Sequence, residues 1–197
     1  TAEVVLLRGT RCPSLAKAPT VDGNLGPDEW AGAAEVSGFV GPADAAPAAR
    51  RTTVRIGHDG QQLYLAFICG GQSRPVARDR GQDGSVWEDD ALEIFLQPPG
   101  SRAYYHFGVN AVGSRYDARC EGSTDPRWST PWTARTRADG DAWVAEIAIP
   151  FTSLDAKPEG LWRANFGREE ADTRRATCWS PTMAGFHTPA RFGELGF

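Results

Sequence analysis

The stretch VWEDDALEIFLQP, residues 86–98, decides the fold class of this chain. Apolar side chains occupy every second position of its second half: Leu92, Ile94 and Leu96. A period of two is typical of a β-strand that buries one face, so these residues are predicted to fill a core. Glu93 then points to the opposite face of the strand, away from the core.

The rest of the chain repeats the same period. Turn clusters of Gly, Pro, Asp and Ser recur at short intervals, and long helical patterns are missing. We therefore predict an all-β antiparallel sandwich of two twisted, jelly-roll-like sheets, forming a single domain over residues 1–197, with short helical pieces only at 26–33 and 150–154. The expected strands are 52–59, 62–69, 90–97, 104–113, 133–140, 142–149 and 161–170.

Composition excludes several classes of function. The net charge is −4, and lysine and arginine are scattered, so no basic surface for nucleic acid is expected. No apolar run approaches the roughly 18 residues of a membrane span, and no signal peptide is visible. Seven tryptophans are many for 197 residues. Those outside the core would suit flat apolar ligands such as sugars, because an indole face stacks on C–H surfaces.

The four cysteines, Cys12, Cys69, Cys120 and Cys178, leave two alternatives open. No CxxC pair occurs, which disfavours zinc-ribbon and thioredoxin-type chemistry. The even count allows two disulfides in an oxidising compartment. Cys69 lies in the apolar segment LYLAFIC, so a buried thiol is the other interpretation.

The acids beside Trp87 do not predict catalysis. Asp89 and Asp90 are adjacent on an extended chain, so they point to opposite sides and cannot flank one glycosidic bond. They are expected to fix the turn, or to contribute oxygen ligands to calcium. No HExxH, GxSxG, Cys–His or phosphate-loop signature occurs, and the chain is predicted not to be an enzyme.

Seven segments follow one another along nearly the whole chain: VDGNLGPDEW, TTVRIGHDGQQLYLAF, VWEDDALEIFLQP, YYHFGVNAVG, WVAEIAIPFTSL, WRANFGREE and CWSPTMAGFHTPARFGELGF. No single segment is decisive, but their order is specific. In this order they resemble the family-9 carbohydrate-binding modules and their relatives in the DOMON-like β-sandwich group.

The resemblance implies a non-catalytic domain that binds an oligo- or polysaccharide, such as a glucan or xylan chain end. It also implies secretion or a periplasmic or cell-surface location, a place in a larger polysaccharide-degrading protein or assembly, and often structural calcium. The sugar would stack between Trp87 and Phe186, while Glu93 and Asn110 bond its hydroxyls. Arg168, Trp179 and His187 are further candidates for the site, each with a structural alternative.

Two departures from the family pattern leave other functions open. Gly108 and Gly167 stand where hydrogen-bonding side chains are expected, which would also fit a structural or interaction domain whose sugar site has decayed. Cousins of this sandwich bind haem, and Met183 lies near His187 in sequence, so a haem-binding electron-transfer domain is the other alternative.

Overall fold

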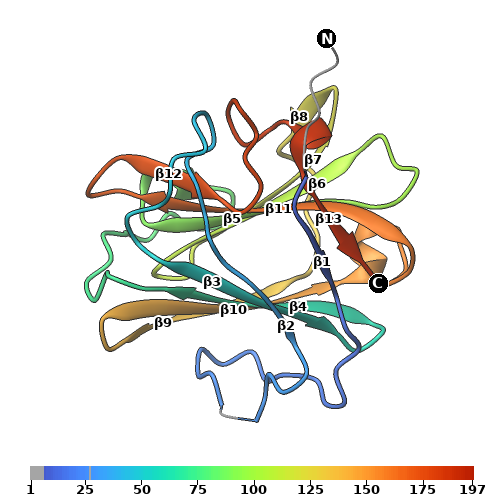
Figure 1. Cartoon of the computed structure of the whole chain (residues 1–197), viewed down its shortest axis with the longest axis horizontal. Coiled ribbons are helices and arrows are strands. Elements are labelled where there is room, and N and C mark those ends of the chain that lie inside the picture. The colour runs from blue at the N-terminus through green and yellow to red at the C-terminus, as the bar shows by residue number, and fades with distance from the viewer. Residues whose placement is uncertain (1–6, 27) are drawn as a thin grey trace.

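Two β-sheets pack face to face in the computed structural model, which describes residues 7–26 and 28–197. In Figure 1 the larger sheet forms the upper layer and the smaller sheet the lower layer. The predicted all-β sandwich is confirmed. None of the helices in the described part of the chain is long and apolar enough to cross a membrane.

The larger sheet has eight strands in the order β1-β13-β11-β5-β6-β7-β8, with β12 beside the second half of β11. Neighbouring strands run antiparallel except β1 and β13, which are parallel. The bounds are β1 Gly9–Arg11, β5 Ala91–Gln97, β6 Tyr104–Asn110, β7 Arg115–Glu121, β8 Ser123–Asp125, β11 Leu161–Glu170, β12 Arg175–Cys178 and β13 Gly193–Gly196.

The smaller sheet has five antiparallel strands in the order β2-β3-β4-β10-β9. Their bounds are β2 Ala34–Val36, β3 Thr52–His58, β4 Gln62–Cys69, β9 Thr133–Asp139 and β10 Ala142–Pro150. Three short 3-10 helices complete the described elements: η1 Val86–Glu88, η2 Phe151–Leu154 and η3 Pro189–Arg191.

The core lies between the sheets and is aromatic. Leu92, Ile94 and Leu96 of β5 are buried in it, as their alternation predicts. Trp143 of the smaller sheet and Trp162 of the larger sheet are fully buried there. Because the inward residues of β5 fill the core, its alternate residues are directed to the outer face of the larger sheet.

The segment VDGNLGPDEW covers the outer face of the smaller sheet and does not form the short helix expected at 26–33. In its described part, Trp30 donates from Nε1 to the buried carboxylate of Glu146 at 3.0 Å. The backbone N–H groups of Asp22 and Gly23 donate to the same carboxylate at 3.1 and 2.9 Å. The motif is therefore a tether between a loop and β10; Pro27 lies outside the described residues.

The four cysteines are free thiols, and all four are buried. The disulfide alternative is therefore not the one that the structure shows. Burial raises the pKa of Cys12 and of Cys69 to about 12. The fold therefore holds the Cys12 and Cys69 thiols in the protonated form.

Candidate functional site

A pocket of about 400 Å³ opens on the outer face of the larger sheet. Ligand pockets in proteins begin at about 300 Å³, so this one has room for a small ligand. Strands supply most of its lining. The strand residues are Glu93, His106, Tyr116, Thr124 and Glu169, and the remaining residues are Trp87, Phe186 and His187.

Glu93 lies at the centre of the pocket floor because of strand register. It pairs with Gly108 on β6 and with Gly167 on β11, its two neighbours in the sheet. A Cβ on Gly108 would lie 2.7 Å from Cγ2 of Val86, and one on Gly167 would lie 2.8 Å from Cε2 of Phe186. The two glycines therefore let apolar side chains approach the sheet on either side of Glu93.

Trp87 forms the open side of the pocket. It lies in η1, directly after the buried Val86, and its side chain is 41% exposed. Its ring meets that of Tyr116 edge-on, with centroids 5.1 Å apart. Anchoring by Val86 and Tyr116 leaves an indole surface exposed beside the buried Glu93, which is the arrangement expected of an apolar platform.

Phe186 and His187 close the opposite side. Phe186 is 8% exposed and packs edge-on against Phe95, with ring centroids 6.0 Å apart. His187 is exposed at the rim, and its Nδ1 lies 2.8 Å from the Tyr104 hydroxyl. Burial, followed by the neighbouring His106, lowers the pKa of His187, so its imidazole is neutral at neutral pH.

Two carboxyl groups meet at the pocket floor. Burial raises the pKa of Glu169 to about 9, and the charge of Glu93 and a hydrogen bond with it act in the same direction. Glu169 is therefore protonated at neutral pH and can donate to the Glu93 carboxylate. Glycoside hydrolysis requires two carboxyl groups about 5 Å or more apart, so a hydrogen-bonded pair leaves no room for a sugar bond between them.

His106 is the second partner of Glu93. Its Nε2 lies 2.7 Å from Oε2 of Glu93, yet the oxygen lies off the direction in which an N–H would point, so the contact is not an aligned hydrogen bond. The ring is 2% exposed and stacks on Phe95, with centroids 4.5 Å apart and an interplanar angle of 12°. Both ring nitrogens are thus buried and lack an aligned partner among the described residues.

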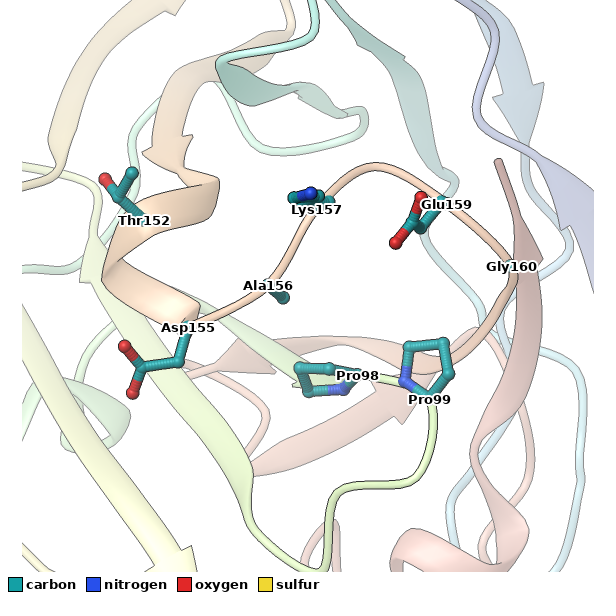
Figure 2. A pocket seen from close by; sticks show the side chains of 8 residues that line it. All are labelled: Pro98, Pro99, Thr152, Asp155, Ala156, Lys157, Glu159 and Gly160. Carbon is teal, nitrogen blue, oxygen red and sulfur yellow. The ribbon is translucent and has the colours of Figure 1, made fainter.

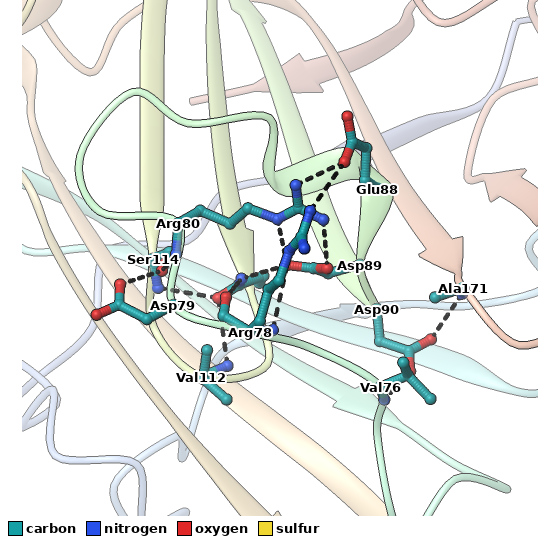
Figure 3. Close-up of polar contacts among 11 residues, drawn as sticks. Val76, Arg78, Asp79, Arg80, Glu88, Asp89, Asp90, Val112, Ser114 and Ala171 are labelled. Carbon is teal, nitrogen blue, oxygen red and sulfur yellow. Dashed lines mark hydrogen bonds and ion pairs between the residues drawn. The ribbon is translucent and has the colours of Figure 1, made fainter.

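Asp89 and Asp90 hold the segments around the site in place (Figure 3). Asn110 contributes to the same network. Asp89 pairs with Arg80 at 2.7 Å and accepts from Nδ2 of Asn110 at 2.8 Å. The Oδ1 atom of Asn110 accepts from the backbone N–H of Ser114 at 2.9 Å. Asn110 is fully buried with its amide engaged, and it does not line the pocket, so the structure places it away from the predicted sugar contact.

Arg168 and Trp179 also lie away from the pocket. Arg168 is fully buried on the inward face of β11, where it donates to the Gly70 carbonyl and to Oε1 of Gln72 at 3.0 Å. Trp179 is 3% exposed and belongs to the core, where it packs on Phe166. Both side chains take the structural alternative that the sequence left open.

The haem alternative depended on Met183 and His187 acting together. Met183 is 50% exposed and is not among the residues that line the pocket beside His187. The structure therefore gives no support for joint ligation by these two residues.

Asp89 and Asp90, the residues considered as calcium ligands, are engaged by other groups of the protein. Asp89 is paired with Arg80, and Asp90 accepts backbone N–H groups from Val76 and Ala171. Among the described residues, the one group of three or more potential side-chain ligands that lie close together contains two imidazoles. Calcium takes oxygen ligands, so this group of side chains does not fit calcium.

A larger cavity of about 820 Å³ lies elsewhere (Figure 2). Pro98 and Pro99 line one side of it, and the segment 152–160 lines the other. Its charged side chains, Asp155, Lys157 and Glu159, are all exposed to solvent. Size alone favours this cavity, but no buried polar group converges on it, so the smaller pocket is the better candidate.

Sequence reasoning missed Glu169, Tyr116 and Thr124 as lining residues. Glu169 is two residues from Gly167 on one strand, so both are directed to the outer face of the sheet. This two-residue spacing, combined with the pairing of Gly167 with Glu93, could have identified Glu169 as a lining residue. Tyr116 and Thr124 come from β7 and β8, two strands that were not expected.

Fold and pocket together define a β-sandwich module with a pocket on the outer face of one sheet. The chain belongs to the carbohydrate family 9 binding domain-like family, whose model matches residues 21–196. No curated protein matches the chain.

Solved structures share the fold at low sequence identity. A candidate carbohydrate-binding protein from Bacteroides uniformis is 20% identical with a TM-score of 0.79, over 98% of this chain and 100% of that one. A family 9 module from Caldicellulosiruptor kristjanssonii, solved with glucose, is 19% identical with a TM-score of 0.65, over 95% of each chain. The same organism's module solved with cellotriose gives a TM-score of 0.66 at 19% identity, over 95% of this chain and 93% of that one.

Proposed function

We propose that the protein binds a saccharide without catalysis in the pocket formed by Trp87, Glu93, Phe186 and their neighbours. One observation carries the proposal: an indole that is 41% exposed stands beside a buried carboxylate in the same pocket. An apolar ring face next to a hydrogen-bond acceptor matches a pyranose, which has C–H faces and hydroxyl edges. Membership of the carbohydrate family 9 binding domain-like family supports the same class of ligand.

In this proposal Trp87 stacks on the sugar ring and Glu93 accepts its hydroxyl donors. His187, at the rim, and the neutral carboxyl of Glu169 supply further polar contacts, in place of Asn110. Phe186 is mostly buried, so it closes the slot and offers a ring edge more than an open face. The expected affinity is micromolar to millimolar, about −4 to −8 kcal/mol.

The ligand that we propose to test first is a β-glucan chain end, because related modules are solved with glucose and cellotriose. The protein would serve as an extracytoplasmic module that holds a larger polysaccharide-degrading assembly on its substrate.

Isothermal titration with glucose, cellotriose and xylotriose tests the proposal. Trp87→Ala should weaken binding about tenfold or more, because loss of one stacking contact costs about 1.4 kcal/mol. Leu161→Ala is the control, since Leu161 is also exposed, at 55%, but lies at the far end of β11. Saccharide binding that is absent in the wild type, or equal in the wild type and Trp87→Ala, would contradict the proposal.

A further inference from the structure

The pocket floor contains a mixed set of metal-ligating side chains. One carboxylate oxygen of Glu93 and one imidazole nitrogen each of His106 and His187 lie within 4.8 Å of one another. They come from β5, β6 and the loop that follows β12, so the topology of the sheet and its covering loop brings them together. Two imidazoles and one carboxylate make up one of the ligand sets that bind zinc in open sites.

His106 is only partly satisfied by its surroundings, because its Nε2 lies close to Glu93 while its Nδ1 has no hydrogen bond among the described residues. It is 2% exposed, and neither of its ring nitrogens has an aligned hydrogen bond among the described residues. Burying a polar nitrogen without a partner costs free energy, so such groups usually serve a purpose. Stacking on Phe95 fixes the ring plane, and Nε2 is held 2.7 Å from the Glu93 carboxylate.

His187 is oriented in the way that metal-ligating histidines usually are. Its Nδ1 lies 2.8 Å from the Tyr104 hydroxyl. When Nδ1–H donates to that oxygen, the lone pair is left on Nε2, and a second contact of this kind commonly fixes a ligand's tautomer. The ring meets His106 edge-on with centroids 4.9 Å apart, at the solvent-exposed rim through which an ion would enter.

The charge of the pocket favours a cation. The lining contains the Glu93 carboxylate and no lysine or arginine, while Glu169, protonated at neutral pH, adds no positive charge. An ion on Glu93 would replace its hydrogen bond with Glu169 and its off-axis contact with His106.

We propose that Glu93, His106 and His187 form a site for one divalent first-row transition-metal ion, of which zinc is the best match. Ligand atoms around a tetrahedral zinc ion are about 3.3 Å apart, so the Glu93–His106 contact must widen and His187 must move inward. We expect rotation of the Glu93 and His187 side chains to bring about both changes. Imidazole ligands select this class over calcium, and the fourth coordination position faces the pocket, where water or a ligand oxygen can bind.

The proposal does not depend on saccharide binding, and metal alone tests it. After treatment with a chelator and its removal, zinc chloride titrated into the protein should give one saturable site with micromolar or tighter affinity. His187→Ala and His106→Gln should each weaken binding at least tenfold. His58→Gln is the matched control, because His58 is the one remaining histidine of the three in the chain and lies at the end of β3, outside the pocket.

Cobalt chloride gives a second readout, since Co²⁺ with nitrogen and oxygen ligands shows visible absorption that depends on its geometry. We expect a band that saturates at one equivalent and disappears in His187→Ala. Because His187 is at the surface, that variant should fold normally. No saturable binding by the wild type, or undiminished affinity in both pocket variants, would overturn the metal site.

Cellotriose titrated with and without zinc separates the two proposals. Zinc binding without saccharide binding supports the metal site and contradicts the proposed function. Saccharide binding without zinc binding supports the proposed function and overturns the metal site.

Discussion

Gly108 and Gly167 flank Glu93 in register, and each is the point where a covering side chain touches the sheet. From sequence, the two glycines looked like lost hydrogen-bonding residues. In the structure, Val86 and Phe186 occupy the space that larger residues would need. The glycines therefore set the depth of the pocket, and Glu93, His106 and Glu169 carry its polar chemistry.

This role of Gly167 leads to a prediction at the residue scale. Gly167→Ala would place a Cβ 2.8 Å from Phe186, so the ring must shift. We expect a loss of about 1–2 kcal/mol in the free energy of unfolding, as for an overpacked site, together with altered ligand affinity. Urea denaturation and a titration of the best ligand measure the two effects.

Gly185→Ala is the matched control, because a Cβ at Gly185 meets nothing within 4 Å. It should change stability by less than about 0.5 kcal/mol. Equal effects of the two substitutions would mean that the Gly167–Phe186 contact does not limit the pocket.

The sequence could predict part of the candidate site for reasons visible in single residues. Alternation in β5 identified the face of Glu93, the resemblance identified Trp87 and Phe186, and the position of His187 beside Phe186 made it a candidate; all four line one pocket. Asn110 could not be placed, because its burial depends on contacts with Asp89 and with the segment 76–80, distant in sequence. The sequence pattern around Asn110 does not show that a distant segment covers it.

At the scale of elements, the start of β5 is tied to two distant segments by a single carboxylate (Figure 3). Asp90 is fully buried and accepts from the backbone N–H groups of Val76 and Ala171. It thus holds the loop before η1 and the turn after β11 against the same strand. Both segments border the pocket-bearing sheet.

Removing this carboxylate should destabilise the fold. Asp90→Ala leaves two partly buried N–H groups without their acceptor, which should lower the free energy of unfolding by about 3 kcal/mol. The midpoint of urea denaturation measures the loss. Asp139→Ala, on the exposed end of β9, should change it by less than about 0.5 kcal/mol. A loss at Asp90 no larger than that at Asp139 would contradict the assigned role.

The elements that sequence could predict are the long ones with clear alternation. The segments 52–59, 62–69, 133–140 and 142–149 correspond to β3, β4, β9 and β10 within one or two residues. Strands such as β1, β2 and β12 have only three or four residues and exist because of their partners. β7 was missed because RYDARCE carries a buried acid, Asp117, whose partner Trp132 lies outside the strand.

For the whole molecule, the buried thiols predict a uniform chemical behaviour. Burial raises the pKa of Cys12 and Cys69 to about 12 and that of Cys178 to about 11, so little thiolate forms at neutral pH. The native protein should resist alkylation by iodoacetamide, and all four cysteines should react after denaturation. Mass spectrometry counts the modified sites.

A reducing agent should leave the unfolding midpoint unchanged, because the structure has four free thiols. Fast alkylation of the native protein, or a midpoint that falls on reduction, would contradict this assignment. The first result would indicate an exposed thiol and the second a disulfide.

The parallel pairing of β1 with β13 has a consequence for how the protein reaches its fold. Gly9 lies opposite Glu194, so this strand pair brings together segments that are separated by almost the whole chain. Closing so long a loop costs entropy before any contact repays it, and chains with many distant pairings fold in milliseconds to seconds. The β1–β13 pair is expected to join the sheet last, on a β11–β5–β6 framework that has already assembled.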